Sequence, residues 1–510
     1  MTRRTRGFTL VVLALAAVLS ISLWLRVSDS TPETESAQEV EARVRATCSA
    51  CHPFPPPDIL PRVWWRNTIE SMVKLREVVR PRSFSMGISV DEVAGWYESR
   101  APENLPIAHT LSRRRSGPLR FSKHPVQLGP KSGSAVATVQ RLDPGLVPDA
   151  KLVLAAPNMA NGSVHLFVPP RGVHLIGTAE HPARVASGDL DGDGLADLVI
   201  SDLGDPMPTD DLVGRVLVAV NAGDGSFALE TVLDGVGRVA DARPVDLDED
   251  GDLDIAVAAF GNLRSGGIYI LHNQTRASGP LDFRVEKISH RTGAVSLVPV
   301  EALDVGPGRG FAVAFAQQHE LVSLFFENGG RYEEHVVYRG PHSNWGTSNL
   351  TATDFDGDAD VDFLLAHGDT LDDGLPFKFY QGVEWLENLG NAQFSAHRIG
   401  TLYGAHSAEA VDLDGDGDLD VVASSYLPQV NLSVSAKRMR LDSLVWFERT
   451  DGDWIPWSIE LNHPLHTSMT VVDINRDGRP DIVAAINRAW DLEESLSGPS
   501  LEVFVNEGPR

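Results

Sequence analysis

Two cysteines and a histidine form the most reactive group of side chains near the start of this sequence. The only two cysteines of the 510-residue chain stand three positions apart, and a histidine follows directly, as Cys48-Ser-Ala-Cys51-His52. At this spacing each thiol can add to one vinyl group of a haem, while the imidazole reaches the iron as an axial ligand. A redox dithiol and half of a zinc site use the same pair of thiols. Because a second cysteine pair and a βαβ context are both missing, the motif favours one covalently bound haem c.

A haem iron bound by His52 takes a sixth ligand, which is often a methionine. Met72 lies in the middle of the stretch NTIESMVKL, and Met86 lies just before the next helix that we expect. Either methionine can instead be a flexible filler of the core. The sequence leaves the choice between Met72 and Met86 open.

Two predicted helices bracket the cysteine motif. Residues 37–47 can form a helix that leads into Cys48, and residues 89–100 can form a helix with a Ser89 cap and acidic residues in its first turn. In this arrangement residues 41–105 resemble the small class I cytochrome c domains. The resemblance implies that the first helix carries the haem motif and that an aromatic residue of the last helix packs across it.

A second chemistry recurs farther along the chain, in five acidic nonapeptides. They read DLDGDGLAD, DLDEDGDLD, DFDGDADVD, DLDGDGDLD and DINRDGRPD, and a β-branched apolar strand follows each of them. Side-chain oxygens at positions 1, 3, 5 and 9 of a tight loop suit Ca²⁺, and glycine at position 6 permits the sharp reversal. The expected ligands are Asp189, Asp191, Asp193, Asp197, Asp246, Asp248, Asp250, Asp254, Asp354, Asp356, Asp358, Asp362, Asp412, Asp414, Asp416, Asp420, Asp473, Asn475, Asp477 and Asp481.

Two other structures could produce such acidic loops. An EF-hand would place helices on both sides and a glutamate at position 12, whereas strands flank these loops. A solvated acidic turn without metal would hold three or four negative charges within a few ångströms, which a bound cation relieves. We therefore expect up to five Ca²⁺ ions. The third loop is the least certain of the five, because Ala359 replaces its glycine at position 6.

A strand motif keeps step with these loops. An aromatic or long residue, two spacers, often His or Glu, one spacer and then Ile or Val recur seven times, beginning at Phe121, Arg171, Phe227, Phe283, Tyr332, Phe394 and Trp454. Seven units over residues 120–510 have about the size of a four-stranded propeller blade each. The pattern resembles the FG-GAP or VCBS repeat of integrin α-like heads. The resemblance implies a mainly β protein with a seven-bladed β-propeller, behind a small all-α cytochrome c-like domain.

The phase of the repeat makes two further predictions. The loops around Asp143 and from Asp304 have lost their ligands and should bind no metal. The last unit lacks an outer strand, whereas residues 121–126 form an outer strand without a blade. We expect this N-terminal strand to complete the seventh blade, because a closed ring leaves no open sheet edge.

The N-terminus predicts export. Three arginines precede residues 8–25, an uncharged apolar run that reads as a signal anchor or a signal peptide and would place the chain on the periplasmic side of the inner membrane or outside the cell. The expected organisation is a signal or anchor over 1–26, a linker over 27–40, a haem domain over 41–105, a linker over 106–119 and the propeller over 120–510.

The acidic composition limits the kinds of partner that the chain can bind. The chain has 70 acidic and 44 basic residues and therefore a net charge of −26. This charge excludes a protein that binds the phosphate backbone of nucleic acids independently of sequence. On the propeller face opposite the acidic loops, His181, His342, Trp345, His406 and His466 could line a binding surface or could satisfy backbone groups at blade edges.

Three functions remain open at this stage. The first is an exported, membrane-tethered electron-transfer protein whose calcium-stabilised propeller binds an unidentified redox partner or substrate. The second is a calcium-dependent adhesion or scaffolding protein with a non-catalytic propeller, whose ligand is an extracytoplasmic protein or carbohydrate. The third is a periplasmic oxidoreductase that passes electrons to the haem, although the sequence holds no dinucleotide fingerprint in a βαβ context. Electron transfer and binding are favoured over catalysis.

Overall fold

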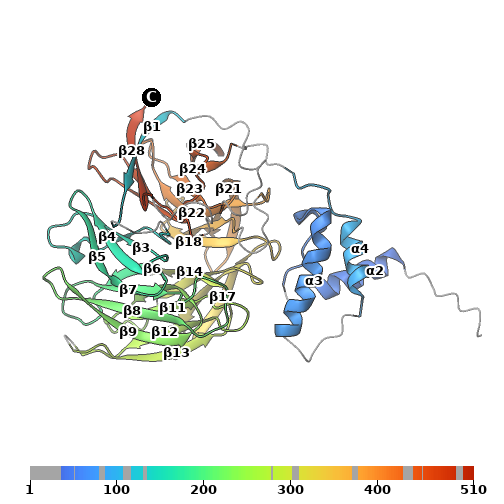
Figure 1. Cartoon of the computed structure of the whole chain (residues 1–510), viewed down its shortest axis with the longest axis horizontal. Coiled ribbons are helices and arrows are strands. Elements are labelled where there is room, and N and C mark those ends of the chain that lie inside the picture. The colour runs from blue at the N-terminus through green and yellow to red at the C-terminus, as the bar shows by residue number, and fades with distance from the viewer. Residues whose placement is uncertain are drawn as a thin grey trace, which may run out of the picture.

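A computed structural model describes most of the chain. The described residues are 36–50, 52–79, 87–106, 117–129, 135–276, 279–300, 309–369, 377–428, 440–450, 452–489 and 498–510. Three helices come first and a ring of seven four-stranded sheets follows (Figure 1). The protein is therefore mainly β, with a seven-bladed propeller behind a short helical segment.

Each blade is an antiparallel sheet of four strands, which follow chain order in blades 1 to 6. Blade 1 comprises β2 (Gln140–Leu142), β3 (Val153–Pro157), β4 (Ser163–Val168) and β5 (Gly172–Thr178). Blade 2 comprises β6 (Pro182–Gly188), β7 (Asp197–Asp202), β8 (Gly214–Asn221) and β9 (Phe227–Val236). Blade 3 comprises β10 (Val239–Val245), β11 (Asp254–Ala259), β12 (Gly267–Asn273) and β13 (Phe283–Ser289). Blades 4 and 5 comprise β14 (Ala294–Val300), β15 (Gly310–Phe315), β16 (Leu321–Glu327) and β17 (Tyr332–Arg339); β18 (Thr347–Thr353), β19 (Asp362–His367), β20 (Gly382–Asn388) and β21 (Phe394–Thr401). Blades 6 and 7 comprise β22 (Ala405–Val411), β23 (Asp420–Ser425), β24 (Asp442–Thr450) and β25 (Asp453–Leu461); β26 (Met469–Val472), β27 (Asp481–Ala485), β28 (Leu501–Pro509) and β1 (Leu119–Val126).

The hydrophobic core lies between adjacent blades. Every residue of the second strand β7 is buried, because both faces of this strand are covered by neighbouring blades, whereas the outer strand β9 alternates between exposed and half-buried residues over most of its length. One apolar cluster joins Val199 and Val218 of blade 2 to Val257 of blade 3, and all three side chains are fully buried. Burying such a side chain contributes about 1.5 to 3 kcal/mol, so each blade depends on its neighbours for stability.

The ring closes through the N-terminal strand. Strand β1 pairs antiparallel with β28, from Val126 opposite Leu501 to Phe121 opposite Asn506. The sheet order β1-β28-β27-β26 confirms that a strand from the start of the propeller completes the last blade (Figure 1). All seven expected outer strands occupy the fourth position of a blade.

The described residues before the ring form the helices α2 (Ala37–Cys48), α3 (Arg62–Val79) and α4 (Val90–Glu98), with a 3₁₀ turn at Pro57–Ile59. Both α2 and α4 begin with a capping box, formed by Ser36 with Glu39 and by Ser89 with Glu92. Helix α2 thus starts within the range expected for the linker. Arg66 of α3 forms ion pairs with Asp91 and Glu98 at either end of α4.

Several sequence-based expectations fall outside the described residues: the apolar run at residues 8–25, Cys51, Met86 and the degenerate loop from Asp304. Among the described residues, no helix is both long and apolar enough to cross a membrane. At the other degenerate loop, Asp143 caps a short 3₁₀ turn, Pro144–Leu146, instead of starting an acidic loop.

Candidate metal centres

The five acidic loops connect the first and second strands of blades 2, 3, 5, 6 and 7, and we number them 1 to 5 in chain order (residues 189–197, 246–254, 354–362, 412–420 and 473–481). In loop 1 the backbone is left-handed at Gly192 and again at Gly194, where φ is 69° and 89°. This double reversal turns the backbone N–H groups inward: Gly192 N and Gly194 N each donate to an oxygen of Asp189 at 2.9 Å. The same two loop positions are left-handed in all five loops.

Residues other than glycine hold some of these strained positions. Position 4 is Glu249 in loop 2 and Arg476 in loop 5, with φ of 60° and 65°. Position 6 of loop 3 is Ala359, with φ of 76°. Ala359 N still donates to Asp354 Oδ2 at 3.1 Å, so the glycine replacement that made this loop doubtful preserves the loop geometry.

The aspartate at position 9 anchors each loop to its blade. Asp197 is the first residue of β7; its Oδ2 accepts from Leu190 N at 3.0 Å and its Oδ1 from Asn221 N, at the end of β8, at 2.8 Å. Asp362, Asp420 and Asp481 accept the equivalent pairs of backbone hydrogen bonds. In loop 2, Asp254 Oδ1 accepts from Asn273 N, and its buried Oδ2 has no hydrogen-bond partner among the described residues. These carboxylates therefore join the loop to the second and third strands of the blade.

The structure brings three carboxylates together in four of the five loops, with one oxygen of each within 4.8 Å of the others. The groups are Asp189, Asp191 and Asp197 in loop 1, Asp246, Asp248 and Asp250 in loop 2, Asp354, Asp356 and Asp358 in loop 3, and Asp412, Asp414 and Asp416 in loop 4. Convergent hard oxygens of this kind fit Ca²⁺. The acidic groups could therefore hold the expected ion, whereas Asp193 and the position-9 residues of loops 2 to 4 lie outside the groups.

Loop 5 differs because it carries its own counter-charge. Its ligand set contains Asn475 in place of one aspartate, and Asn475 Nδ2 donates to Asp477 Oδ2 at 3.1 Å. Arg479, at position 7, forms an ion pair with Asp477 and donates from Nε to Asn506 O at 2.8 Å. A guanidinium that already compensates Asp477 reduces the need of this loop for a cation.

The clustered carboxylates of the loops bear an electrostatic cost. Burial, with a smaller contribution from neighbouring loop carboxylates, raises the pKa of Asp197 and of Asp254 to about 6, although backbone N–H groups lower both. Burial likewise raises the pKa of Asp420 to about 7. A divalent cation would offset this cost, because its charge favours the ionised form of every carboxylate around it.

The described part of the cysteine motif lies in an aromatic environment. Cys48 ends α2 and is half-buried, and burial raises the pKa of its thiol. Trp65 of α3 stacks on Tyr97 of α4 with ring centroids 3.9 Å apart, and Phe54 stacks on the same tyrosine at 6.1 Å. The same apolar cluster includes Cys48. An aromatic residue of the last helix thus packs against the end of the first helix.

A backbone contact indicates the tautomer of His52. Its Nδ1 lies 2.9 Å from Pro53 O, and because a carbonyl oxygen only accepts, Nδ1 carries the proton. The lone pair of the imidazole is then on Nε2, as in many metal-bound histidines. Met72 is 47% exposed on α3, so the described structure places it at the surface.

The histidines expected on the opposite face mostly bind backbone carbonyls. His181 Nδ1 lies 2.8 Å from Met159 O, and His406 Nδ1 lies 2.7 Å from Thr467 O. His342 is 4% exposed and packs edge-on against Trp345 and Tyr380. His181 and His406 therefore satisfy backbone groups at blade edges, which is the second of the two roles that the sequence left open.

Sequence reasoning missed a second group of metal-binding side chains. His466 was expected on this face, but the structure also brings Glu460, His463 and Glu502 within 4.8 Å of its ring. The spacing His463-x-x-His466 was a signal for a metal site. Glu502 is distant in sequence and meets the others only because β28 pairs with β27.

Comparisons with known proteins add little to this geometry. No family model matches the chain, and no curated protein matches it. Among solved structures the chain is similar to one described as "Crystal structure of BBS1N in complex with ARL6DN, soaked with mercury", at 10% identity over 77% of this chain and 98% of that chain, with a TM-score of 0.45. The strand order defines the class of the protein: it is a seven-bladed β-propeller with acidic inter-strand loops and three preceding helices.

Proposed function

We propose that this protein is an exported electron-transfer protein with one covalent haem c on its helical segment and a calcium-stabilised FG-GAP or VCBS-type propeller that binds the redox partner. The observation that carries the proposal is His52, which follows Cys48-Ser-Ala-Cys51 in the sequence and presents an unprotonated Nε2 because Nδ1 donates to Pro53 O. When bound, the haem would supply a one-electron couple at its iron.

Apolar side chains surround the described part of the motif. Cys48 and His52 would hold the group together with Cys51, and Phe54, Trp65 and Tyr97 supply an apolar wall beside Cys48. An apolar shell limits solvent access and thereby tunes the reduction potential of a metal centre.

The helical segment also contacts the propeller. The apolar cluster of the helices continues to Trp345 and Tyr380, which precede β18 and β20 of blade 5. A partner that binds the propeller next to blade 5 would therefore lie close to the haem-bearing segment, which is the arrangement that electron transfer between bound proteins requires.

Covalent haem is the first property to test. The chain, expressed with a cytochrome c maturation system, should show a haem stain that survives a denaturing gel and a reversible redox couple. The variant that combines Cys48→Ala and Cys51→Ala should lose both and keep the melting curve of the propeller. An unstained wild-type band, next to a control cytochrome that matures normally, would contradict the proposal.

The sixth ligand is tested on the same protein. A methionine ligand produces a methionine-to-iron charge-transfer band in the oxidised spectrum. Met72→Ala and Met86→Ala should differ, with the band lost in only one of them. Loss in neither variant would show that the iron has another sixth ligand.

A second candidate function is calcium-dependent binding or scaffolding without electron transfer. The observation in its favour is that the helices already have an aromatic core, in which Trp65 stacks on Tyr97 and the Tyr97 hydroxyl donates to Pro55 O at 2.9 Å. This function requires that the variant without both cysteines binds its protein or carbohydrate ligand as the wild type does.

A further inference from the structure

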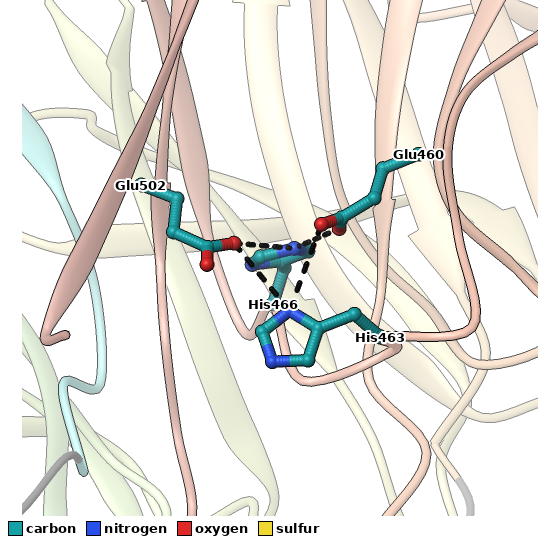
Figure 2. Close-up of side chains that lie close together, drawn as sticks. All are labelled: Glu460, His463, His466 and Glu502. Carbon is teal, nitrogen blue, oxygen red and sulfur yellow. Dashed lines mark hydrogen bonds and ion pairs between the residues drawn. The ribbon is translucent and has the colours of Figure 1, made fainter. Parts of the chain in front are cut away.

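Four side chains with metal-binding atoms meet where blade 6 joins blade 7 (Figure 2). Glu460 lies near the end of β25, His463 and His466 lie on the connection to β26, and Glu502 is the second residue of β28. His466 is fully buried and Glu502 is 5% exposed. The group therefore has the character of a built site and not of a surface patch.

The distances within the group match those around a small divalent ion. His466 Nε2 lies 2.7 Å from Glu460 Oε2 and 3.9 Å from Glu502 Oε2. His463 Nδ1 lies 3.4 Å from Glu502 Oε2 and 3.7 Å from Glu460 Oε1. Zinc bonds to nitrogen and oxygen of about 2.0 to 2.2 Å place neighbouring tetrahedral ligands about 3.3 to 3.6 Å apart, and the four distances lie on both sides of this range.

The second nitrogen of each imidazole indicates which atom faces the site. His466 Nδ1 lies 3.1 Å from Ala485 O and Nε2 lies 2.7 Å from Glu460 Oε2, and because both oxygens accept, a metal ion on Nε2 would replace the proton of the second contact while Nδ1 keeps its own. His463 Nδ1 is buried and has no hydrogen-bond partner among the described residues. Its Nε2 lies 3.4 Å from Arg488 Nη2, and this guanidinium must turn away when Nδ1 binds a metal, because Nε2 then carries the proton.

A lysine compensates the two carboxylates in the metal-free protein. Lys123 Nζ lies 2.5 Å from Glu460 Oε1 and 2.7 Å from Glu502 Oε2. Lys123 therefore supplies a positive partner to both carboxylates.

We propose that Glu460, His463, His466 and Glu502 bind one zinc-like divalent ion, which displaces the Lys123 ammonium from the two carboxylates. Two imidazole nitrogens select such an ion over Ca²⁺, which prefers oxygen ligands. The site goes beyond the proposed function, since it involves neither the haem motif nor the acidic loops. Because Lys123 lies on β1, the ion would release a contact between the closing strand and β28, whereas its own ligands join blade 6 to blade 7.

Calorimetric titration of the full chain with ZnCl₂, in saturating CaCl₂, tests the site. We expect one equivalent of Zn²⁺ to bind, and the variant that combines His463→Gln and His466→Gln to bind that equivalent at least about tenfold more weakly. His397→Gln is the matched control, because it also removes an imidazole that pairs with a glutamate. His397 Nε2 lies 2.6 Å from Glu387 Oε2 in blade 5, outside the proposed site. Unchanged binding in the double variant would overturn the proposal.

Lys123→Gln tests the displacement. This variant should bind Zn²⁺ more tightly than the wild type, because the competing ammonium is gone. Equal or weaker binding would contradict the exchange of Lys123 for the ion. If the double histidine variant does not fold, X-ray absorption at the zinc edge of the wild type decides. Imidazole scattering supports the site, whereas a shell of oxygens alone would place the ion in the acidic loops and overturn it.

Discussion

At the residue scale, the surroundings of Glu320 disfavour the charged form of its carboxyl group. Glu320 is 3% exposed, and its Oε2 accepts a hydrogen bond from Thr347 N at 2.8 Å. Burial, together with the negative charge of Asp369, raises the pKa of Glu320 from 4.5 to about 8, although Thr347 and Gly346 lower it. The folded protein thus holds a proton at neutral pH that the unfolded chain releases.

This proton makes stability depend on pH. Between pH 4.5 and about 8 the folded state binds more protons than the unfolded state, so the free energy of unfolding falls as pH rises through this window. Glu320→Gln should remove this contribution and stabilise the protein at pH 8.5 by about 1 to 3 kcal/mol. Urea unfolding at pH 5 and pH 8.5 measures it. Glu333→Gln, at an exposed carboxyl, is the control, and equal slopes for wild type and Glu320→Gln would contradict the argument.

Ala359 offers a second test at the residue scale. A residue other than glycine in the left-handed region costs the folded state about 1 to 2 kcal/mol. Glycine avoids this cost, but its larger conformational entropy in the unfolded chain offsets part of the gain in stability. Ala359→Gly should therefore raise the free energy of unfolding by about 0.5 to 1 kcal/mol. Gly417→Ala is the matched reverse change, because φ is 100° there and a Cβ would meet no atom within 4 Å. Chemical unfolding should show changes of opposite sign for the two variants, and destabilisation by Ala359→Gly would contradict a left-handed backbone at this position.

At the scale of elements, strand β1 closes the ring. It pairs with β28 over residues 119–126 and supplies Lys123, which is the ammonium partner of the buried Glu502. Removal of β1 would expose the edge of β28 and leave a buried carboxylate without this counter-charge.

Two truncations separate the closing strand from the helices before it. A chain that starts at residue 128 should melt on the order of 10 °C below a chain that starts at residue 117, because only the second retains β1. Differential scanning calorimetry of both chains at equal calcium concentration makes the comparison. Identical melting temperatures would show that β1 does not stabilise the ring.

At the scale of the whole molecule, we expect calcium to hold neighbouring strands in register. The position-9 aspartates join the acidic loops to the second and third strands, so loss of the ions should loosen four blades together. When the free Ca²⁺ concentration is 100 times the Kd of a site, binding at that site raises the free energy of unfolding by about 2.7 kcal/mol.

Chelation tests this role. A calcium chelator should lower the melting temperature, and added Ca²⁺ should restore it. Loop 5 should contribute least, because Arg479 already pairs with Asp477. Asp414→Asn in loop 4 should therefore reduce the effect of Ca²⁺ more than Asp477→Asn does. A melting curve that is the same with and without chelator would rule out structural calcium.

Local patterns in the sequence sufficed for the blades and for most of the acidic loops. The phased outer strands, the capped helix before Glu98 and the closing strand near Phe121 all follow from short-range periodicity, capping and the count of strands. Asp354, Asp356 and Asp358 come together because a nine-residue loop can bring its own side chains to one point. Such features need no knowledge of distant contacts.

What remained beyond the sequence depends on residues far apart in the chain. Glu502 meets His463 and His466 only after β28 pairs with β27, and Lys123 reaches these carboxylates only after β1 closes the ring. The dual role of Asp197, which binds the backbone of β8 as well as facing its loop, appears only once the sheet is formed. The sequence by itself determined the repeating unit and its acidic loops, since both are local. The tertiary structure decided which distant charges share one buried place, because closure of the ring sets those distances.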